Sequence, residues 1–293
     1  MPTPERLAEQ FEEHRAHLRA VGYRMLGSVT EAEDAVQEAW IRLGRTDVSG
    51  VENLRAWLTT VVARVCLDML RARTSRREEP LDTHVPDPVI ARAPDNPEAD
   101  AIVADSVGLA LLVVLDTLDP SERLAFVLHD VFGMTFDEVA PIVDRSPVAA
   151  RQLASRARRR VQDTAPKAEP DLRQQRRVVD AFMAAARDGN FEELVAVLDP
   201  NIVLRADGGA LPGLSRIVRG AAAVASQAAT FTKSGLSSQV VLVNGQLGFV
   251  SRRPDGRVFS VLGFTIADGR IVRIDILADP ERLTRLDLSA IDG

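Results

Sequence analysis

The sequence predicts a multidomain protein in which two all-α domains, a helical bundle and a helix-turn-helix bundle, precede an α+β domain. Apolar residues recur at helical spacing over 5–73 and 99–163, whereas the last third changes from helices to short strand-like runs. Five prolines and no helical periodicity mark the stretch between the helical segments as a linker. The expected domains are 1–77, 99–163 and 173–293, with linkers at 78–98 and 164–172.

The composition describes an ordinary globular chain and excludes several classes of protein. The 293 residues carry 36 Lys and Arg against 42 Asp and Glu, a net charge of −6, and the single cysteine excludes a disulfide framework. The longest nearly uncharged apolar run, Val107–Leu115, is too short to span a bilayer, and the N-terminal residues lack the apolar segment of a secretory signal. We expect a cytoplasmic protein with neither a metal nor a cofactor.

The first domain is expected to contain an acidic amphipathic helix. A capping box, Thr30–Glu33, predicts where this helix begins. Apolar residues at helical spacing from Ala35 to Leu43 form the expected buried face. Another face is lined by Asp34, Gln37 and Glu38. The plain alternative is a helical bundle whose polar face is only solvated.

A second amphipathic helix is expected over Arg55–Arg73. Its polar residues Arg64, Asp68, Arg71 and Arg73 can share a face, and residues 71–77 hold four arginines with no acid. A concentrated basic patch on an acidic chain favours local contact with a polyanion. A solvated helix end is the alternative interpretation.

The segments EDAVQEAWIRL and NLRAWLTTVVARVCLDMLRAR resemble the promoter-melting domain of extracytoplasmic-function sigma factors over about residues 7–77. The resemblance implies that Asp34, Gln37 and Glu38 contact the clamp of core RNA polymerase. It also implies that the loop Gly44–Asn53 and the helix after it read and hold open the −10 promoter element. A melted strand needs a cationic track, and the residues expected to supply it are Arg55, Arg64, Arg71 and Arg73.

The second domain shows helix-turn-helix spacing. A capping box at Thr135–Glu138 and the pair Ser146-Pro147 predict a short helix over 136–143, a three-residue turn and a longer helix over 147–162. We expect Pro141 to kink the short helix. On the longer helix, small and apolar residues form one packed stripe. A lone helix-turn-helix pattern is only moderately specific, and a helical hairpin without a DNA role is the alternative interpretation.

Outside that stripe the longer helix is basic, since residues 145–160 hold six arginines and no acid. Arg and Gln side chains near its start can read base edges in a major groove, and later arginines can bind phosphates. The segment from Leu118 to Val161 resembles the domain of the same sigma family that binds the −35 element. The residues expected on this DNA are Arg145, Arg151, Gln152, Ser155, Arg156, Arg158 and Arg159.

The last third predicts two helices over 173–198 followed by antiparallel strands. Strand-like runs are separated by the turn signals Asn244-Gly245, Asp255-Gly256 and Asp268-Gly269. The pattern FMAAARDGNFEELVAVLDPNIVLRADGG resembles the SnoaL-like, cone-shaped fold over about residues 173–280.

Sigma factors with such a fused domain form one extracytoplasmic-function subgroup, in which that domain acts on the sigma part. The hallmark motifs of the subgroup correspond here to a "DGGG"-like loop with Asp207, Gly208 and Gly209 and an "NPDKL"-like tail with Asp279, Pro280 and Leu283. A Trp-Leu-Pro linker motif of the subgroup is replaced here by 84–88, HVPDP. We therefore expect an intramolecular contact between the sigma domains and the C-terminal domain.

A fused enzyme is the competing hypothesis, because relatives of this fold perform acid–base chemistry on polycyclic ketones. The last third has no His and no Tyr, so only Asp207 and Asp275 are candidate acids or bases. We favour the simpler interpretation, in which Asp207 caps a turn and Asp275 is a solvated strand residue, and we expect no catalytic residue. A ligand pocket remains a second alternative, with the lining Phe182, Met183, Leu204, Phe249 and Phe264.

These observations together predict an alternative sigma factor. It binds core RNA polymerase, recognises the −35 and −10 elements, initiates transcription and is controlled by its own C-terminal domain. The expected partners are core polymerase and promoter DNA. A DNA-binding module fused to a cyclase or isomerase is the alternative, and a repressor that works without polymerase leaves the acidic face of the first domain without a role.

Overall fold

The computed structural model describes residues 4–47, 50–76, 83–93, 108–165, 171–211, 213–231 and 235–292. These form two compact units, the first made of Met1–Pro80 with Val114–Thr164 and the second of Leu81–Val113 with Ala165–Gly293. Parts of both expected linkers, residues 78–82, 94–98 and 166–170, lie outside the described residues, as do Arg77 and part of the loop Gly44–Asn53. Among the described helices, none is long and apolar enough to cross a membrane.

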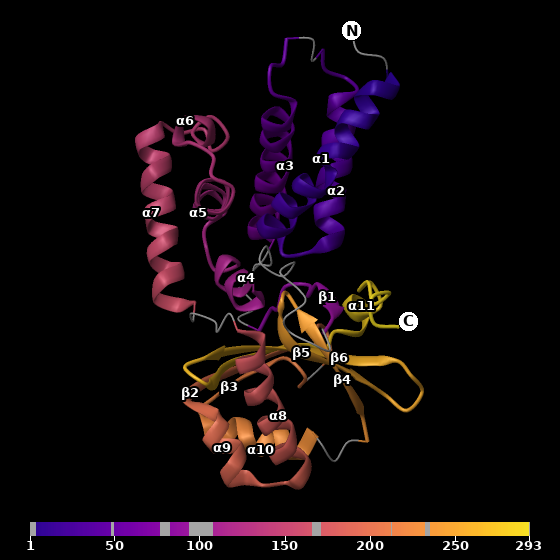
Figure 1. The fold of residues 1–293 in the computed structure, drawn as a ribbon. Helices are drawn as coiled ribbons and strands as arrows, with labels where there is room; N and C mark the ends of the chain where they lie inside the picture. The colour runs from indigo at the N-terminus through magenta and orange to yellow at the C-terminus, as the bar shows by residue number, and fades with distance from the viewer. Residues whose placement is uncertain are drawn as a thin grey trace. The chain divides into compact units, whose positions relative to one another are not determined.

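The first unit begins with three helices, α1 (Pro4–Leu26), α2 (Val29–Leu43) and α3 (Leu54–Arg76), which contact one another (Figure 1). Their apolar faces meet in a common core that includes Leu18, Val36 and Leu58, each fully buried. Gly22 of α1 allows close approach to α2, because a Cβ there would press on Ala32. The helical bundle expected from the sequence is therefore present.

The start of α2 differs from the prediction. The helix is capped by Ser28, whose extended backbone lets its hydroxyl accept a hydrogen bond from the Glu31 amide, and the expected capping box at Thr30–Glu33 is wrong. The same four-residue spacing occurs two residues earlier, as Ser28 and Glu31, so the sequence offered two overlapping N-termini. Glu33 instead pairs with Arg15 and Arg19 of α1.

The rest of the first unit is a second helical group. It contains α5 (Pro120–Phe126), the π-helical turn η2 (Val127–Val131), α6 (Phe136–Val139) and α7 (Pro147–Thr164), while α4 (Leu109–Leu115) crosses the boundary between the units. Asp119 caps α5 as expected, with Pro120 in the first helical turn. The buried Arg123 of α5 donates from Nε and Nη2 to the backbone oxygen of Arg24 at the end of α1, 3.2 and 3.1 Å away.

The described residues of the second unit form a sheet with strand order β1-β4-β5-β6-β7-β2-β3. Its strands are β1 (Ile90–Arg92), β2 (Leu198–Asp207), β3 (Arg216–Arg219), β4 (Ser237–Val243), β5 (Gln246–Arg252), β6 (Val258–Ala267) and β7 (Arg270–Leu277). The pairs from β4 to β7 are antiparallel hairpins, as the turn signals predicted, whereas β2 and β7 run parallel. The backbones of Asn244 and Asp268 have φ of 51° and 49°, which matches their place in tight turns.

One face of this sheet is covered by α8 (Leu172–Asp188), α9 (Phe191–Val197) and α10 (Ala221–Phe231) (Figure 1). Apolar residues of these helices and of alternate sheet positions form a single core, which includes Val179, Leu194, Leu204 and Ile274. Gln175, itself buried, reaches from α8 to accept a hydrogen bond from the amide of Leu247.

The opposite face of the sheet is covered by residues 83–93 and by the C-terminal tail with α11 (Pro280–Leu283). Val85 and Ile90 from the first segment and Leu283 and Ile291 from the tail bury themselves against sheet residues such as Val261. The described part of the expected linker 78–98 is therefore extended, as predicted, but it belongs to the second unit and adds β1 to the edge of the sheet beside β4.

Candidate functional site

The acidic face of α2 is exposed where the sequence expected it. The side chains of Asp34 and Gln37 are exposed, and that of Glu38 is half-buried beside Arg42, whose Nε lies 2.8 Å from Glu38 Oε1. Ile41, one turn further on, is 45% exposed although it is a large apolar side chain. The helix therefore presents two acidic groups, an amide and an apolar residue on one face, because these positions are three or four residues apart.

The arginines of α3 do not form one track. Arg64 and Arg71 are exposed, and Arg64 donates from Nη2 to the backbone oxygen of Pro141 at 3.0 Å. Arg55 lies beside His17, with 3.1 Å between Arg55 Nη2 and His17 Nδ1. Arg73 is half-buried, pairs with Glu31 and donates to the Leu26 oxygen. The expectation that Arg73 shares a face with Arg64 is wrong, since nine residues at about 100° each place it half a turn away.

The helix-turn-helix forms from α6 and α7. Thr135 makes the expected capping box with Glu138, and the hydroxyl of Ser146 accepts from the Ala149 amide at the start of α7. The short helix ends at Val139 rather than at 143, because Pro141 has no amide to continue the helical hydrogen bonds. The chain then passes through turns to Asp144, whose φ is 55°.

Helix α7 has one buried face and one exposed face. The buried residues are those of the expected stripe, Ala150, Leu153, Ala154 and Ala157, while Ala149 and Val161 are half-buried. Of the residues expected on DNA, Arg158 is half-buried. The others are exposed: Arg145, Arg151, Gln152, Ser155, Arg156 and Arg159. The small stripe residues let α7 approach α5, with which it makes its main contacts.

Three of the α7 arginines are engaged by acids of the same unit. Arg156 and Arg160 contact Glu122 at 2.9 and 3.5 Å, and Arg158 contacts Asp130 at 2.5 Å. The guanidinium of Arg151 lies over the ring of Phe136, 5.3 Å from its centre, and that ring stacks on His129 at 3.8 Å. The end of α7 is thus partly neutralised, whereas its first turns combine Arg151 with uncharged polar groups.

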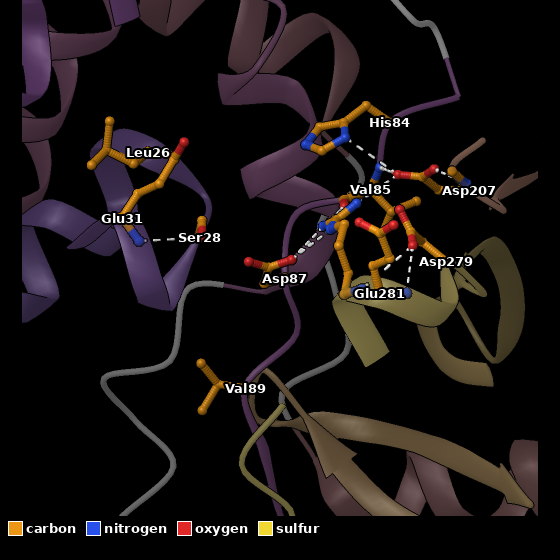
Figure 2. A network of polar contacts seen from close by, with 12 residues as sticks. Leu26, Ser28, Glu31, His84, Val85, Asp87, Val89, Asp207, Asp279 and Glu281 are labelled. Atoms are coloured by element: carbon orange, nitrogen blue, oxygen red, sulfur yellow. Dashed lines mark hydrogen bonds and ion pairs between the residues drawn. The ribbon is translucent and has the colours of Figure 1, made fainter. Parts of the chain in front are cut away.

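In the second unit, a network of polar contacts joins the sheet, α11 and the extended segment 83–93 (Figure 2). The carboxylate of Asp207, at the end of β2, accepts from the Val85 amide at 3.0 Å and lies 3.2 Å from His84 Nδ1. Arg282 of α11 donates to Asp207 at 2.7 Å, to Asp87 at 2.8 Å and to the Val85 oxygen at 2.5 Å. The Arg282 guanidinium therefore links Asp207, at the end of β2, to the backbone of Val85 and to the side chain of Asp87.

The two sequence motifs of the C-terminal domain meet at this network. Asp279 caps α11 by accepting from the amides of Glu281 and Arg282, and Pro280 occupies the first helical turn. A Cβ at Gly209, whose φ is 59°, would collide with the Asp279 carboxylate, and one at Gly208 would collide with Leu214. Glycine is therefore required here because the loop lies directly against the cap of α11. Leu283 is buried in the core on that side of the sheet.

The charge of Asp207 is strongly stabilised. Burial alone raises its pKa, but hydrogen bonds from His84, Val85 and Gly209 together with the charge of Arg282 outweigh burial and lower the pKa to about 2. The Gly209 amide lies 3.1 Å from Asp207 Oδ1, so the prediction that this residue caps a turn is confirmed.

The prediction that Asp275 is solvated is wrong. Asp275 is 1% exposed rather than solvated, and Arg273 Nε contacts both of its carboxylate oxygens at 3.1 and 3.0 Å, with Arg205 3.9 Å away. Burial raises the pKa of Asp275, and the two arginines oppose this rise. Sequence reasoning missed this burial because an alternating strand with charged residues is typical of a solvated face, and here that face is covered.

The two carboxylates considered for catalysis lie away from the apolar cluster considered as a pocket. Leu204 and Ala206 belong to the core beneath the helices, so Asp207, which alternates with them, faces the other side of the sheet. Asp275 likewise alternates with Ile274 and Ile276. The cluster itself is packed ring against ring, with Phe264 5.4 Å from Phe182 and 5.5 Å from Phe249, Leu204 buried nearby and Met183 half-buried beside them. This separation gives no support to the fused-enzyme alternative.

Comparisons with known proteins agree with these features. Residues 10–76 match Sigma-70 region 2, and residues 108–161 match Sigma-70, region 4. The ECF RNA polymerase sigma factor SigJ of Mycobacterium tuberculosis (strain H37Rv) is 39% identical over 290 residues, which span 94% of this chain and 92% of that protein. The chain belongs to the extracytoplasmic-function (ECF) RNA polymerase sigma factors.

One further relative and one solved structure extend this result to the C-terminal unit of the ECF sigma factor. The probable ECF RNA polymerase sigma factor SigI of Mycobacterium tuberculosis (strain CDC 1551) is 36% identical over 283 residues, 93% of each chain. The crystal structure of Mycobacterium tuberculosis SigJ matches with a TM-score of 0.73 and 35% identity, over 96% of this chain and 99% of that one. The expected fold class, two all-α sigma domains followed by an α+β SnoaL-like domain, is confirmed.

The family matches place the acidic helix α2 of this ECF sigma factor in region 2 and the helix-turn-helix in region 4. Which side chains contact polymerase or DNA stays a prediction at the level of single residues. Sequence reasoning missed Arg282 as a site residue, although this arginine lies within the tail motif. A signal was present, since the "NPDKL"-like motif has a cation at the position that Arg282 occupies here.

Proposed function

We propose that this ECF sigma factor binds core RNA polymerase, recognises the −35 and −10 elements of its promoters and starts transcription under the control of its C-terminal unit. Helix α7 is the observation that carries the promoter part of this proposal. It is the second helix of a helix-turn-helix, begins at a capped N-terminus and exposes Arg151 and Gln152 on the side opposite its buried stripe. That arrangement suits a helix lying in a major groove.

Region 2 supplies the other two functions in this proposal. The exposed Asp34 and Gln37, with Glu38 beside them, form the polymerase contact, and Arg64 and Arg71, which share a face of α3, contact the melted −10 strand. Arg55 lies half a turn from Arg64, beside His17, and is not part of that face. Arg73 has a different part, because its pair with Glu31 ties α3 to the start of α2. Core polymerase works in the cytoplasm, which is where we expect this chain to act.

Control by the C-terminal unit is proposed to act through the segment between the two sigma regions. Residues 83–93 lie between region 2 and region 4 in the sequence, and Asp207, Arg282 and the edge of β4 hold them. A linker held in this way cannot change its conformation freely. Two domains that bind separate DNA elements need a linker that can span the distance between those elements. This segment has the sequence HVPDP where the subgroup has a Trp-Leu-Pro motif, and its contacts with Arg282 are made by Val85 and Asp87.

The test is multi-round transcription in vitro with core polymerase and a genomic promoter library. The full-length chain is compared with Arg282→Ala, with Arg285→Ala as the control because Arg285 is exposed on the same tail, and with a chain that ends near Val161. We expect specific transcripts from the full-length chain or its variants, and a change in yield for Arg282→Ala that Arg285→Ala does not show.

Two outcomes would contradict the proposal separately. Silence from every version would remove the sigma function, and a core-polymerase pull-down would then test the repressor alternative, since a repressor is not retained. Transcripts of equal yield from Arg282→Ala and Arg285→Ala would leave the sigma function intact but remove control through the linker.

A further inference from the structure

Five large apolar side chains are exposed in the described part of the chain, and Val148 has the highest exposed fraction of them. It is 69% exposed in the first turn of α7, directly after Pro147. A β-branched residue gains nothing for helix stability at this position, and here it buries little surface. The fold of region 4 therefore gives no reason for a valine at this place.

The position of Val148 on the helix is informative. At about 100° per residue, it lies opposite the middle of the buried stripe formed by Ala150, Leu153, Ala154 and Ala157. Residues three, four and seven positions later share its face, and these are Arg151, Gln152 and Ser155, all exposed. Val148 is thus at the centre of the surface that the proposed function directs into the major groove.

The charged partners of α7 narrow the DNA-reading surface to its first turns. Arg156 and Arg158 are already paired with Glu122 and Asp130, whereas Arg151 is oriented by the ring of Phe136. An arginine prefers guanine O6 and N7, and a glutamine prefers adenine N6 and N7. An isopropyl group has no hydrogen-bond donor for a phosphate or for these edges. The apolar group that a major groove offers is the C5-methyl of thymine.

We infer that Val148 reads the methyl group of a thymine in the −35 element, beside bases read by Arg151 and Gln152. The inference rests on the proposed function and adds a specificity-determining residue to it. Thymine is the one base of the four whose major-groove edge would bury the exposed isopropyl group of Val148.

The test uses holoenzyme reconstituted from core polymerase and the full-length chain. Random DNA duplexes are first selected for binding, which gives the preferred −35 sequence. Each thymine of that site is then replaced by deoxyuridine, which removes only the C5-methyl group. The affinity for each duplex is measured for the unmodified chain, for Val148→Ala and for Val161→Ala. Val161→Ala is the control, because Val161 is a half-buried valine on the packed face of the same helix.

We expect deoxyuridine at one position to weaken binding of the unmodified chain about fourfold, the effect of one methyl group in an apolar contact. Val148→Ala should bind the thymine and deoxyuridine duplexes equally, and Val161→Ala should keep the fourfold difference. If Val148→Ala keeps the difference, or if no deoxyuridine affects the unmodified chain, the inference is wrong. Val148→Ala weakening core binding instead would also overturn it, because the side chain would then serve a protein contact.

Failure of the proposed function has a different signature. Holoenzyme that selects no duplex and makes no transcript would remove the sigma function and this inference together. Holoenzyme that selects a defined −35 sequence without any methyl dependence would remove the inference alone.

Discussion

Arg282 Nη1 lies 2.7 Å from Asp207 Oδ2, although the two residues are 75 positions apart in the sequence. The same guanidinium donates to Asp87 and to the Val85 oxygen, in the segment between the two sigma regions. A planar group with several fixed donors can satisfy three acceptors at once, which a lysine cannot do with the same geometry. The substitution of one side chain should therefore release the segment.

Removal of Arg282 should loosen residues 83–93. In Arg282→Ala we expect the amide of Val85 to exchange its hydrogen about 10- to 100-fold faster, because hydrogen bonds to charged groups contribute about 1.5–3 kcal/mol. Hydrogen exchange read by mass spectrometry measures this directly. Arg282→Lys should give an intermediate rate, and the exposed Arg285→Ala should give the rate of the unmodified chain. Unchanged protection in Arg282→Ala would show that the other contacts suffice.

The Asp207 network should weaken in acid. The pKa of Asp207 is lowered from 3.8 to about 2, so its stabilisation is complete above about pH 4 and is lost as the pH falls to about 2. The amount lost is about 2 kcal/mol. Urea unfolding followed by circular dichroism at about pH 6 and about pH 3 should show a smaller pH dependence for Asp207→Asn than for the unmodified chain. Equal pH dependence in both proteins would rule out this contribution.

Shortening the exposed acids of α2 should weaken polymerase binding without changing the fold. Asp34→Ala removes a charge from an exposed helix face, so helix content should stay constant while affinity for core polymerase falls by about 1–2 kcal/mol. Fluorescence titration of labelled chain with core polymerase measures the affinity. Glu13→Ala removes an exposed carboxylate from α1 and is the control. Full affinity in Asp34→Ala would mean that this residue is only solvated.

The arginines at the end of α7 should differ in their contribution to DNA binding. Arg159 is exposed, whereas Arg158 is held by Asp130 at 2.5 Å. If Arg159 binds a phosphate, Arg159→Ala should reduce the slope of log affinity against log salt by about 0.9, and Arg158→Ala should change that slope less. Holoenzyme binding to one promoter duplex over a salt series gives both slopes. A larger loss for Arg158→Ala would mean that its pair with Asp130 opens on DNA.

Asp275 should be required for stability. Asp275→Ala leaves Arg273 buried without its carboxylate, so we expect a loss of about 3–5 kcal/mol in the free energy of unfolding of the second unit. Chemical denaturation followed by circular dichroism measures this loss. Asp255→Ala, in an exposed turn, should have little effect. An unchanged free energy of unfolding in Asp275→Ala would mean that the arginines bind other partners or water.

Much of the fold follows from local sequence signals. Residues with positive φ lie in all three turns from β4 to β7: Asn244-Gly245, Gly256 and Asp268-Gly269. Thr135, Asp119 and Ser146 mark helix starts that the structure confirms. These signals are local, because a cap or a tight turn depends on a few neighbouring residues. Where two such signals overlapped, at Ser28 and Thr30, the sequence alone did not decide between them.

Long-range contacts were harder to foresee. Strands β1 and β3 are only three and four residues long and form because β4 and β2 offer them an edge, which no periodicity in their own residues reveals. The burial of Asp275 and the engagement of Arg73 and Arg158 depend on neighbours remote in sequence. The sequence shows that these side chains are charged. Only the folded structure shows that each one pairs with an oppositely charged side chain of the same unit.

The pairing of β1 with β4 also orders events in time during synthesis. Ile90–Arg92 is synthesised before region 4, and its partner β4 ends at Val243, 151 residues after Arg92. At about 5–20 residues per second, the segment waits roughly 8–30 seconds for the strand that pairs with it. Each newly made chain therefore passes through an interval in which both sigma regions exist and the segment between them is still unattached.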